Sequence, residues 1–357
     1  MAECPAWELT WDYPPSRRKV VSEIDGAAAV QEQQDRPLIV RLRNWVGDVV
    51  LGVPALQLLQ RHGYSPVLVG KGWAPALLSA QGWPVHVRPG ESLGARVTQL
   101  RGLREAARRI DPGFDRRDNA LVLPTSFSSA LEMRLAGLKA HGYRQEARGL
   151  LLRRAHPIVY GGHALTSYWE LACHFLGIQE APPADIGLKV SDEQKAQAEQ
   201  LRRGAGIAPG YVVICPFAGG TFEKLDKTWP HFPAFAKALK ATGRDVVICP
   251  GPGEDGIVDT NYGGAICLPG VKLGVYNALL QEAALVVSND TGPAHMAAAV
   301  GGRVLSVLGP TKPEQWAPWG RDVHIAQRYP EWMGASEVLS MAEGLLARPL
   351  VRTGEMA

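Results

Sequence analysis

Short apolar runs alternate with helix-like stretches along most of the chain. The run PLIVRL at 37–42 is followed by the amphipathic stretch GVPALQLLQRHG at 52–63, and a second apolar run, SPVLVG, occupies 65–70. Similar pairs follow as far as NALVLPTS at 119–126 and SALEMRLAGLKAHG at 129–142. Strands that alternate with helices are typical of βαβ units, so the pattern predicts a parallel sheet covered by helices.

The same pattern starts again in the second half of the chain, after the Pro-rich stretch QEAPPADIG at 179–187. The apolar runs YVVICPF at 211–217, DVVICPG at 245–251 and ALVVSND at 284–290 are each followed by a glycine-bearing loop and a helix-like segment. Two successive α/β units of similar size predict two doubly wound, Rossmann-like domains that face each other across a cleft.

These patterns also give the expected domain boundaries. We expect an N-terminal extension at 1–36, a first domain at 37–180, a linker at 181–187, a second domain at 188–330 and a C-terminal helical segment at 331–357. The last segment either completes the second domain or crosses back to the first.

Composition is that of a folded protein without a membrane segment. The 357 residues are 46% hydrophobic and 20% charged, and no apolar run approaches the roughly 20 residues of a membrane helix. The first residues lack the apolar stretch of a signal peptide, so we expect a cytoplasmic protein. The cysteines form no C-x-x-C pair and are expected to be core thiols. They are Cys4, Cys173, Cys215, Cys249 and Cys267.

Charge is unevenly distributed along the chain. The net charge is +3, yet residues 37–160 contain 18 Lys and Arg and only 8 Asp and Glu, a local net charge of +10. This asymmetry indicates that the first domain binds an anionic partner. The alternative is that the charges belong to solvated helix faces such as LRGLREAARRI at 100–110.

The segment SNDTGPAH at 288–295 is the most informative motif. It joins the end of a predicted strand to the start of a predicted helix, where open α/β sheets bind ligands and where free N–H groups favour anions. Gly292 allows a phosphate to approach the backbone, Thr291 adds a hydroxyl donor, and His295 lies one turn into the helix. The alternative is a helix capped by Asp290 or Thr291, which is compatible with a phosphate site.

Two more loops follow strands of the same unit. AGGTFEKLDKTWP at 218–230 places Thr221 and Lys227 where they can hold a diphosphate, although it is not a P-loop. CPGPGEDG at 249–256 offers Glu254 to the hydroxyls of a ribose. Because the carboxyl ends of parallel strands meet at one edge of a sheet, the three loops together predict a nucleotide pocket.

The first domain has its own candidate, the turn RNWVGDVV at 43–50. Asp48 follows the first strand at the start of a helix, where a carboxylate stays ionised and can accept a proton. The alternative is a helix cap. The motifs D-x-D, H-E-x-x-H, G-x-S-x-G and a clean G-x-G-x-x-G are absent from the sequence, which argues against metal-held diphosphates, metalloproteases, α/β-hydrolases and ordinary dehydrogenases.

Several separated motifs, spread over residues 37–345, resemble the inverting heptosyltransferases of lipopolysaccharide core assembly (glycosyltransferase family 9, GT-B fold). NWVGDVVLGVPAL resembles the opening turn of that family and implies that Asp48 is the catalytic base. KTWP implies that Lys227 binds phosphate, and SNDTGPAHMAAAVGGRVLSVLGPTKPEQWAPWG implies donor-binding roles for Asp290, Thr291, Gly292 and His295. The segment at 123–152 is closest to the branch that adds the second heptose, heptosyltransferase II.

The resemblance implies transfer of heptose from ADP-heptose to an inner-core precursor of the heptosyl-Kdo-lipid A type, with no metal and no other cofactor. Asp48 would take the acceptor proton, and Lys227 with the helix start at 290–295 would stabilise the leaving diphosphate. The acceptor would be an anionic lipid precursor at the inner-membrane surface, so the cytoplasmic enzyme would work at the cytoplasmic face of that membrane. Nucleic acid is not an expected partner, and the sequence indicates no oligomeric state.

Four residues of the first domain are candidates for contact with the acceptor. They are Arg61, Ser126, Arg134 and Arg144. Two other functions remain open at this point. One is a nucleotide-sugar epimerase of the same architecture, and the other is a nucleotide-sugar-binding protein without catalysis.

Overall fold

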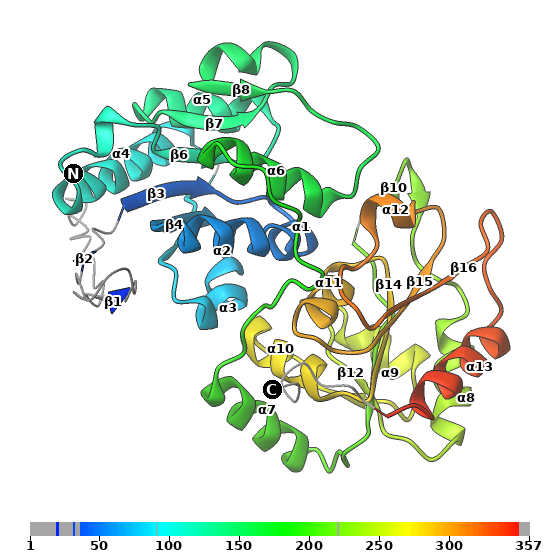
Figure 1. The fold of residues 1–357 in the computed structure, drawn as a ribbon. Helices are drawn as coiled ribbons and strands as arrows, with labels where there is room; N and C mark the ends of the chain where they lie inside the picture. Colours follow the sequence, from blue (N-terminus) through cyan, green and yellow to red (C-terminus); the bar gives the residue numbers. More distant parts are fainter. Residues whose placement is uncertain (1–18, 21–30, 33–35, 91, 220, 350–357) are drawn as a thin grey trace, which may run out of the picture.

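The computed structural model describes residues 19–20, 31–32, 36–90, 92–219 and 221–349. It contains two six-stranded parallel sheets, each covered by helices (Figure 1). The first sheet has the strand order β5-β4-β3-β6-β7-β8. Its strands are β3 (Arg36–Arg41), β4 (Tyr64–Gly70), β5 (Val85–Val87), β6 (Ala120–Val122), β7 (Ala140–Tyr143) and β8 (Arg154–His156).

The second sheet repeats the same order, β13-β12-β9-β14-β15-β16. Its strands are β9 (Val212–Cys215), β12 (Val246–Ile248), β13 (Ile266–Cys267), β14 (Leu285–Asn289), β15 (Val304–Leu308) and β16 (Val323–Gln327). Counted within each sheet, both orders are 3-2-1-4-5-6, the doubly wound arrangement whose ligand site lies where the strand order reverses. The predicted fold class, two Rossmann-like domains, is therefore confirmed.

Helices cover both faces of each sheet. Those of the first domain are α1 (Val46–Leu51), α2 (Val53–Arg61), α3 (Ala74–Leu78), α4 (Leu93–Ile110), α5 (Phe127–Leu135) and α6 (Ala164–Leu176), with short 3₁₀ turns at Ser79–Gln81, Phe114–Arg116 and Glu146–Leu151. Those that follow are α7 (Asp192–Gly204), α8 (Phe232–Ala241), α9 (Asp255–Asn261), α10 (Leu273–Glu282), α11 (Gly292–Ala299), α12 (Pro313–Trp316) and α13 (Ala335–Leu346). Among the described residues, none of these helices has the length and apolar character needed to cross a membrane.

The strands form where the sequence has continuous apolar runs, because a parallel strand covered on both faces buries every side chain. Leu38, Ile39 and Val40 of β3 are fully buried, as are Val286 and Val287 of β14. Cysteine usage agrees with this interior. Cys173 and Cys215 are buried and Cys249 and Cys267 half-buried, all four as free thiols, while Cys4 lies outside the described residues.

The join between the domains is a segment without helix or strand, at 177–191. Helix α6, before it, packs on α2 of the first domain, whereas α7, after it, packs on α10 of the second. The C-terminal helix α13 packs on α8 and β14, and its Val338 and Ala342 belong to the core of the second domain. Residues 335–346 therefore complete the second domain, and the alternative that they cross back to the first is wrong.

Residues of the expected N-terminal extension are described only in part. Two short strands, β1 (Lys19–Val20) and β2 (Gln31–Glu32), pair in antiparallel fashion, and β10 (Thr221–Phe222) pairs in the same way with β11 (Leu225–Asp226) in the second domain.

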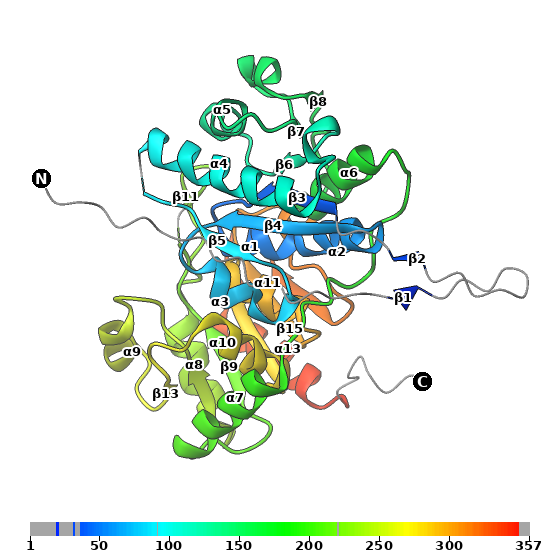
Figure 2. The same cartoon turned by 90° about the vertical axis from the view of Figure 1, so that its left-hand side faces the viewer.

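The two domains meet directly. Helix α1 packs on α11 and α3 on α10, so the carboxyl edges of the two sheets face each other (Figure 2).

Candidate active site

A cavity of about 680 Å³ lies where the two domains meet. Its walls come mainly from the loops after β9, β12 and β14 of the second domain, and α1 and α3 of the first domain close one side. Residues that line it include Val46, Trp73, Cys215, Glu254, Tyr276 and Thr291. The cavity is therefore at the carboxyl edge of the second sheet, where the sequence predicted a nucleotide pocket.

Asp290 holds the predicted phosphate-binding lysine in place. Its Oδ2 accepts hydrogen bonds from Lys227 Nζ at 3.1 Å and from Thr311 Oγ1 at 2.8 Å. Burial opposes the charge of this carboxylate, but His295, Lys227 and Thr311 outweigh burial and lower the pKa of Asp290 to about 2. Asp290 is thus an ionised anchor for Lys227 and not itself a group that would contact a diphosphate.

The start of α11 is not capped by a side chain. Thr291 occupies the cap position in extended backbone conformation and makes no capping hydrogen bond, so the capping interpretation is wrong for Thr291. Asp290 directs its Oδ2 to Lys227 and Thr311 instead. Thr291 lines the cavity, where its hydroxyl and the backbone N–H of Gly292, the first residue of α11, are available to an anionic ligand.

Gly292 and His295 make contacts between the domains that the sequence did not predict. A Cβ atom on Gly292 would lie 2.9 Å from the Cβ of Val46, so the first domain already occupies the space expected to admit a phosphate. A Cβ atom on Gly47 would lie 2.7 Å from Cδ2 of His295. These two glycines let the starts of α1 and α11 approach each other closely. The His295 ring, which is 5% exposed, is packed between the domains.

The other two predicted donor-side residues differ in position. Glu254 lines the cavity, and its Oε2 accepts a hydrogen bond from the backbone N–H of Gly251 at 2.7 Å. Thr221 is exposed on the β10–β11 hairpin and is not among the residues that line the cavity, although Gly219, two positions earlier, is. The structure thus brings Glu254 to the candidate site and leaves Thr221 outside it.

Asn289 was not singled out from the sequence, yet it joins three loops of the site. Its Oδ1 accepts a hydrogen bond from the backbone N–H of Trp229 at 2.9 Å, and its Nδ2 donates one to the carbonyl oxygen of Pro216. Trp229 lies two residues after Lys227. Asn289 therefore fixes the loop that carries the lysine against the strand that carries Asp290.

Asp48 lies across the domain contact, at the carboxyl end of β3 and in the first turn of α1. It is 8% exposed, and its Oδ1 accepts hydrogen bonds from the Tyr168 hydroxyl at 2.5 Å and from Arg43 Nε at 3.3 Å. The cap position of α1 is Trp45, so Asp48 is not a helix cap and that alternative is wrong. Burial would lower the pKa of Arg43, but the neighbouring Tyr168 and Asp48 raise it.

The acceptor candidates separate into two pairs. Ser126 and Arg144 are exposed just after β6 and β7, on the same sheet edge as Asp48. Arg134 lies in the last turn of α5, away from that edge. Arg61 ends α2, about 20 Å along the helices from Asp48 by helix geometry. It pairs with Glu180 at 3.4 Å, so the structure does not place Arg61 at the site.

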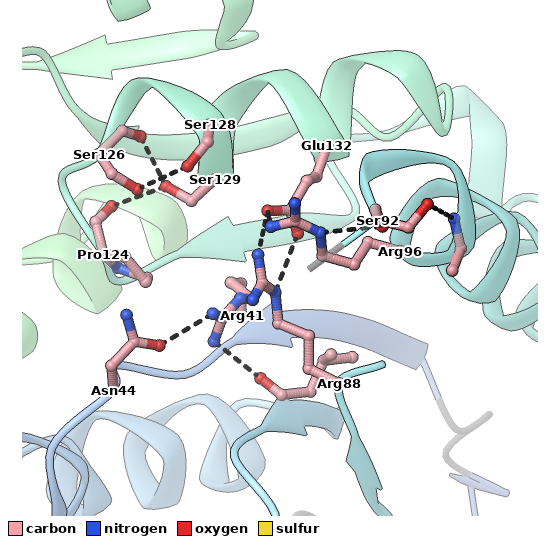
Figure 3. Close-up of polar contacts among 12 residues, drawn as sticks. Arg41, Asn44, Arg88, Ser92, Arg96, Pro124, Ser126, Ser128, Ser129 and Glu132 are labelled. Atoms are coloured by element: carbon pink, nitrogen blue, oxygen red, sulfur yellow. Dashed lines mark hydrogen bonds and ion pairs between the residues drawn. The ribbon is translucent and has the colours of Figure 1, made fainter. Parts of the chain in front are cut away.

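A cluster of arginines that was not predicted from the sequence lies behind the carboxyl edge of the first sheet. Figure 3 shows Arg88 and Arg96 converging on Glu132, with Arg41 beside them. Glu132 is 2% exposed, and its carboxylate accepts hydrogen bonds from Arg88 at 2.7 and 3.3 Å and from Arg96 at 3.2 Å. Arg41 donates to Asn44 Oδ1 at 3.0 Å, and burial together with Arg88 lowers its pKa to about 10.

Arg148 adds a further buried positive charge. It is completely buried and donates to the carbonyl oxygen of Pro124 at 2.8 Å, while its Nε and Nη2 have no partner among the described residues. Burial and the neighbouring Arg43 lower the pKa of Arg148 to about 10. Uncompensated buried charge is costly, so this region favours an anionic ligand. The sequence signal that could have revealed these residues is the presence of arginines after successive strands of the first sheet.

Metal-binding geometry is not evident in the part of the chain that the structure describes. No group of three or more His, Cys, Asp or Glu side chains there is placed to hold a metal ion. The metal-free reaction implied by the resemblance stays a prediction.

Comparison with known proteins gives a consistent result. The family model described as "Glycosyltransferase family 9 (heptosyltransferase)" matches residues 113–340. A segment of 127 residues is 35% identical to lipopolysaccharide heptosyltransferase 3 of Escherichia coli, which covers 33% of this chain and 37% of that relative. The match to lipopolysaccharide heptosyltransferase 2 of E. coli K12 is 26% identical over 310 residues and covers 79% of this chain and 85% of the relative.

Two solved structures share the fold over most of the chain. The structure of E. coli ADP-heptose lps heptosyltransferase II has a TM-score of 0.72 at 22% identity, covering 87% of this chain and 98% of that one. E. coli heptosyltransferase WaaC with ADP-2-deoxy-2-fluoro heptose has a TM-score of 0.63 at 21% identity, covering 86% and 99%. Two facing Rossmann-like domains of this type form the GT-B fold.

Proposed function

Since the chain belongs to glycosyltransferase family 9, the heptosyltransferases, we propose that it transfers a heptose from ADP-heptose to a hydroxyl of an anionic inner-core lipopolysaccharide precursor, with inversion at the anomeric carbon. The observation that supports this best is the placement of Asp48 and the Lys227–Asp290 pair on the two sides of one domain contact, beside the cavity. The WaaC structure with a fluorinated ADP-heptose supports the choice of donor.

The donor binds in the cavity with its diphosphate toward α11. Lys227, held by Asp290, supplies a fixed positive charge. The Thr291 hydroxyl and the backbone N–H of Gly292, at the start of α11, supply hydrogen bonds. These groups stabilise the negative charge that develops on the diphosphate as it leaves, and they are already oriented before the reaction. Glu254, on the same cavity wall, accepts hydrogen bonds from the ribose hydroxyls.

The acceptor hydroxyl approaches from the first domain. Its oxygen attacks the anomeric carbon on the face opposite the diphosphate, and the bond from that carbon to the diphosphate oxygen breaks with its electron pair. The proton of the hydroxyl passes to Asp48 Oδ2, because Oδ1 is already occupied by Tyr168 and Arg43. ADP and the new glycoside with inverted configuration result.

Anionic groups of the acceptor are held by arginines of the first domain. Arg144 is exposed on this edge and can contact the acceptor, while the buried Arg41 and Arg148 add positive potential from the interior. A lipid-linked precursor is reached at the cytoplasmic face of the inner membrane, where this enzyme would work.

Replacement of the base provides the first test. Asp48→Asn keeps an oxygen that accepts from Tyr168 but cannot take a proton, so we expect heptose transfer to fall at least about 100-fold, the usual contribution of a general base. ADP-heptose binding, measured by calorimetry, should stay near the wild-type value. Transfer at the wild-type rate would refute the assignment of Asp48. Turnover of ADP-heptose without an acceptor would favour an epimerase, and binding without any turnover would favour a non-catalytic protein.

Replacement of the lysine tests the donor site. Lys227→Ala removes the charge that Asp290 fixes beside α11, so we expect ADP-heptose affinity to fall by about 10-fold or more, as for loss of a charged hydrogen bond. Lys237→Ala on α8 is the matched control, because that lysine is exposed and lies with Asn261 and Tyr262 at a separate surface pocket. Unchanged donor affinity in Lys227→Ala would contradict the proposed diphosphate site.

A further inference from the structure

We propose that Tyr168 is a positioning residue for catalysis, which fixes Oδ1 of Asp48 so that Oδ2 alone is presented to the acceptor hydroxyl. This inference rests on the proposed function, because it assumes that Asp48 is the base. Tyr168 belongs to α6, 120 residues after Asp48 in the chain. Tyr168 would assist the reaction through Asp48, without contacting either substrate.

The contact between the two side chains is short and buried. The Tyr168 hydroxyl lies 2.5 Å from Asp48 Oδ1, and the residues are 6% and 8% exposed. Burial raises the pKa of Tyr168 well above its ordinary value, with the charge of Asp48 as the next contribution. The phenol therefore stays protonated and donates at every working pH.

Both donors address the same carboxylate oxygen. Arg43 Nε also points to Oδ1, at 3.3 Å, while no described residue donates a hydrogen bond to Oδ2. A carboxylate held at one oxygen by two donors cannot rotate freely, and its second oxygen keeps a fixed direction. The arrangement separates the two oxygens into one for orientation and one for proton transfer.

The helix that carries Tyr168 is itself anchored on both sides of that residue. The Tyr143 hydroxyl donates to the carbonyl oxygen of Ser167 at 2.6 Å, and Trp169 Nε1 donates to the carbonyl oxygen of Glu180 at 2.6 Å. Helix α6 also packs on α1, which carries Asp48, and on α2. A rigid support of this kind is what holds a catalytic group within a fraction of an ångström of its working geometry.

The test compares two tyrosine variants, Tyr168→Phe on α6 and Tyr143→Phe on β7. Each loses one hydroxyl hydrogen bond, and the two bonds involve the neighbouring residues Tyr168 and Ser167 of α6. For Tyr168→Phe we expect kcat of heptose transfer to fall by about 10- to 100-fold, in line with loss of one hydrogen bond to a charged group, with KM for ADP-heptose unchanged. For Tyr143→Phe, whose hydroxyl bonds only to the backbone of Ser167, we expect a comparable loss in Tm and no change in kcat. Equal kcat in Tyr168→Phe and wild type would overturn the proposal.

A double-mutant cycle separates positioning from structure. If Tyr168 acts through Asp48, the change Tyr168→Phe should lower the residual rate of Asp48→Asn by less than about twofold, because coupled residues are not additive. An equal loss in both backgrounds would show a structural role and overturn the inference. Full activity of Asp48→Asn alone would instead overturn the proposed function.

Arg43→Met keeps the cycle decisive if Tyr168→Phe does not fold. The Arg43 side chain is 24% exposed and tolerates replacement more readily. Arg43→Met has no N–H group and removes the second donor to Oδ1, so we expect kcat to fall about fivefold or more, with donor KM unchanged. A wild-type kcat in this variant would overturn the inference that the donors to Oδ1 orient Asp48 for proton transfer.

Discussion

Gly47→Ala tests the domain contact on which the active site depends. The added methyl group would lie 2.7 Å from Cδ2 and 3.2 Å from Nε2 of His295. Carbon atoms in contact prefer about 3.5–4.0 Å, so the separation has to grow by about 1 Å. The His295 ring is 5% exposed, and the flanking Ala294 and Met296 are fully buried, so the ring has no open space to move into. The starts of α1 and α11 must separate instead.

The expected magnitude follows from that overlap. Overpacking of a buried contact costs about 1–3 kcal/mol, which lowers the equilibrium constant for contact between the domains by roughly 5- to 150-fold. Local helix propensity predicts the opposite sign, because alanine in α1 should be favoured over glycine by about 0.5–1 kcal/mol. Gly47→Ala should therefore stabilise α1 locally and destabilise the contact between the two domains.

The assay is kcat of heptose transfer together with the radius of gyration from small-angle X-ray scattering. We expect kcat to fall by at least about fivefold and the molecule to expand, with little change in Tm. Gly344→Ala is the matched control, since it lies in α13, is exposed and would place its Cβ more than 4 Å from other atoms. If Gly47→Ala kept the wild-type kcat and radius of gyration, the close approach of α1 and α11 would not belong to the working enzyme.

Two further predictions concern stability. Glu132→Gln removes the buried negative charge that pairs with Arg88 and Arg96, so we expect the free energy of unfolding to fall by about 3 kcal/mol in urea titrations. Glu105→Gln, in an exposed pair, should change it by less than about 1 kcal/mol, and equal losses would contradict this reasoning. The depressed pKa of Asp290, about 2 against 3.8, stabilises the protein by about 2 kcal/mol above pH 4, and that contribution is lost as the pH falls toward 2. The difference in unfolding free energy between wild type and Asp290→Asn should therefore shrink between pH 4 and pH 2, and a constant difference would refute the linkage.

Local patterns in the sequence predicted the fold class and much of the candidate site. Alternating apolar runs and amphipathic stretches are short-range features, so they identified both α/β units without knowledge of the fold and placed two strand ends within one residue of the observed Arg41 and Asn289. Asp48, Lys227 and Glu254 could be selected because the segments that connect a parallel strand to the next helix are carried to the ligand-binding edge of the sheet.

Contacts between distant segments were beyond that reasoning. The bond from Tyr168 to Asp48 joins positions 120 apart, and the carboxylate of Glu132 meets Arg88 from 44 positions away. Arg61 was a candidate for contact with the acceptor, but it ends α2 and lies at the opposite end of the domain from Asp48. Gly292 has the residue type of a phosphate loop, yet its space is filled by Val46.

The sequence by itself therefore determined which elements form and which residues stand at their ends, because periodicity and turn chemistry act over a few positions. Only the tertiary structure decided which oxygen of Asp48 is free, which arginines share a carboxylate, and how closely the two domains approach. Those outcomes depend on strand order and on side chains packed between separate segments, which no local pattern records.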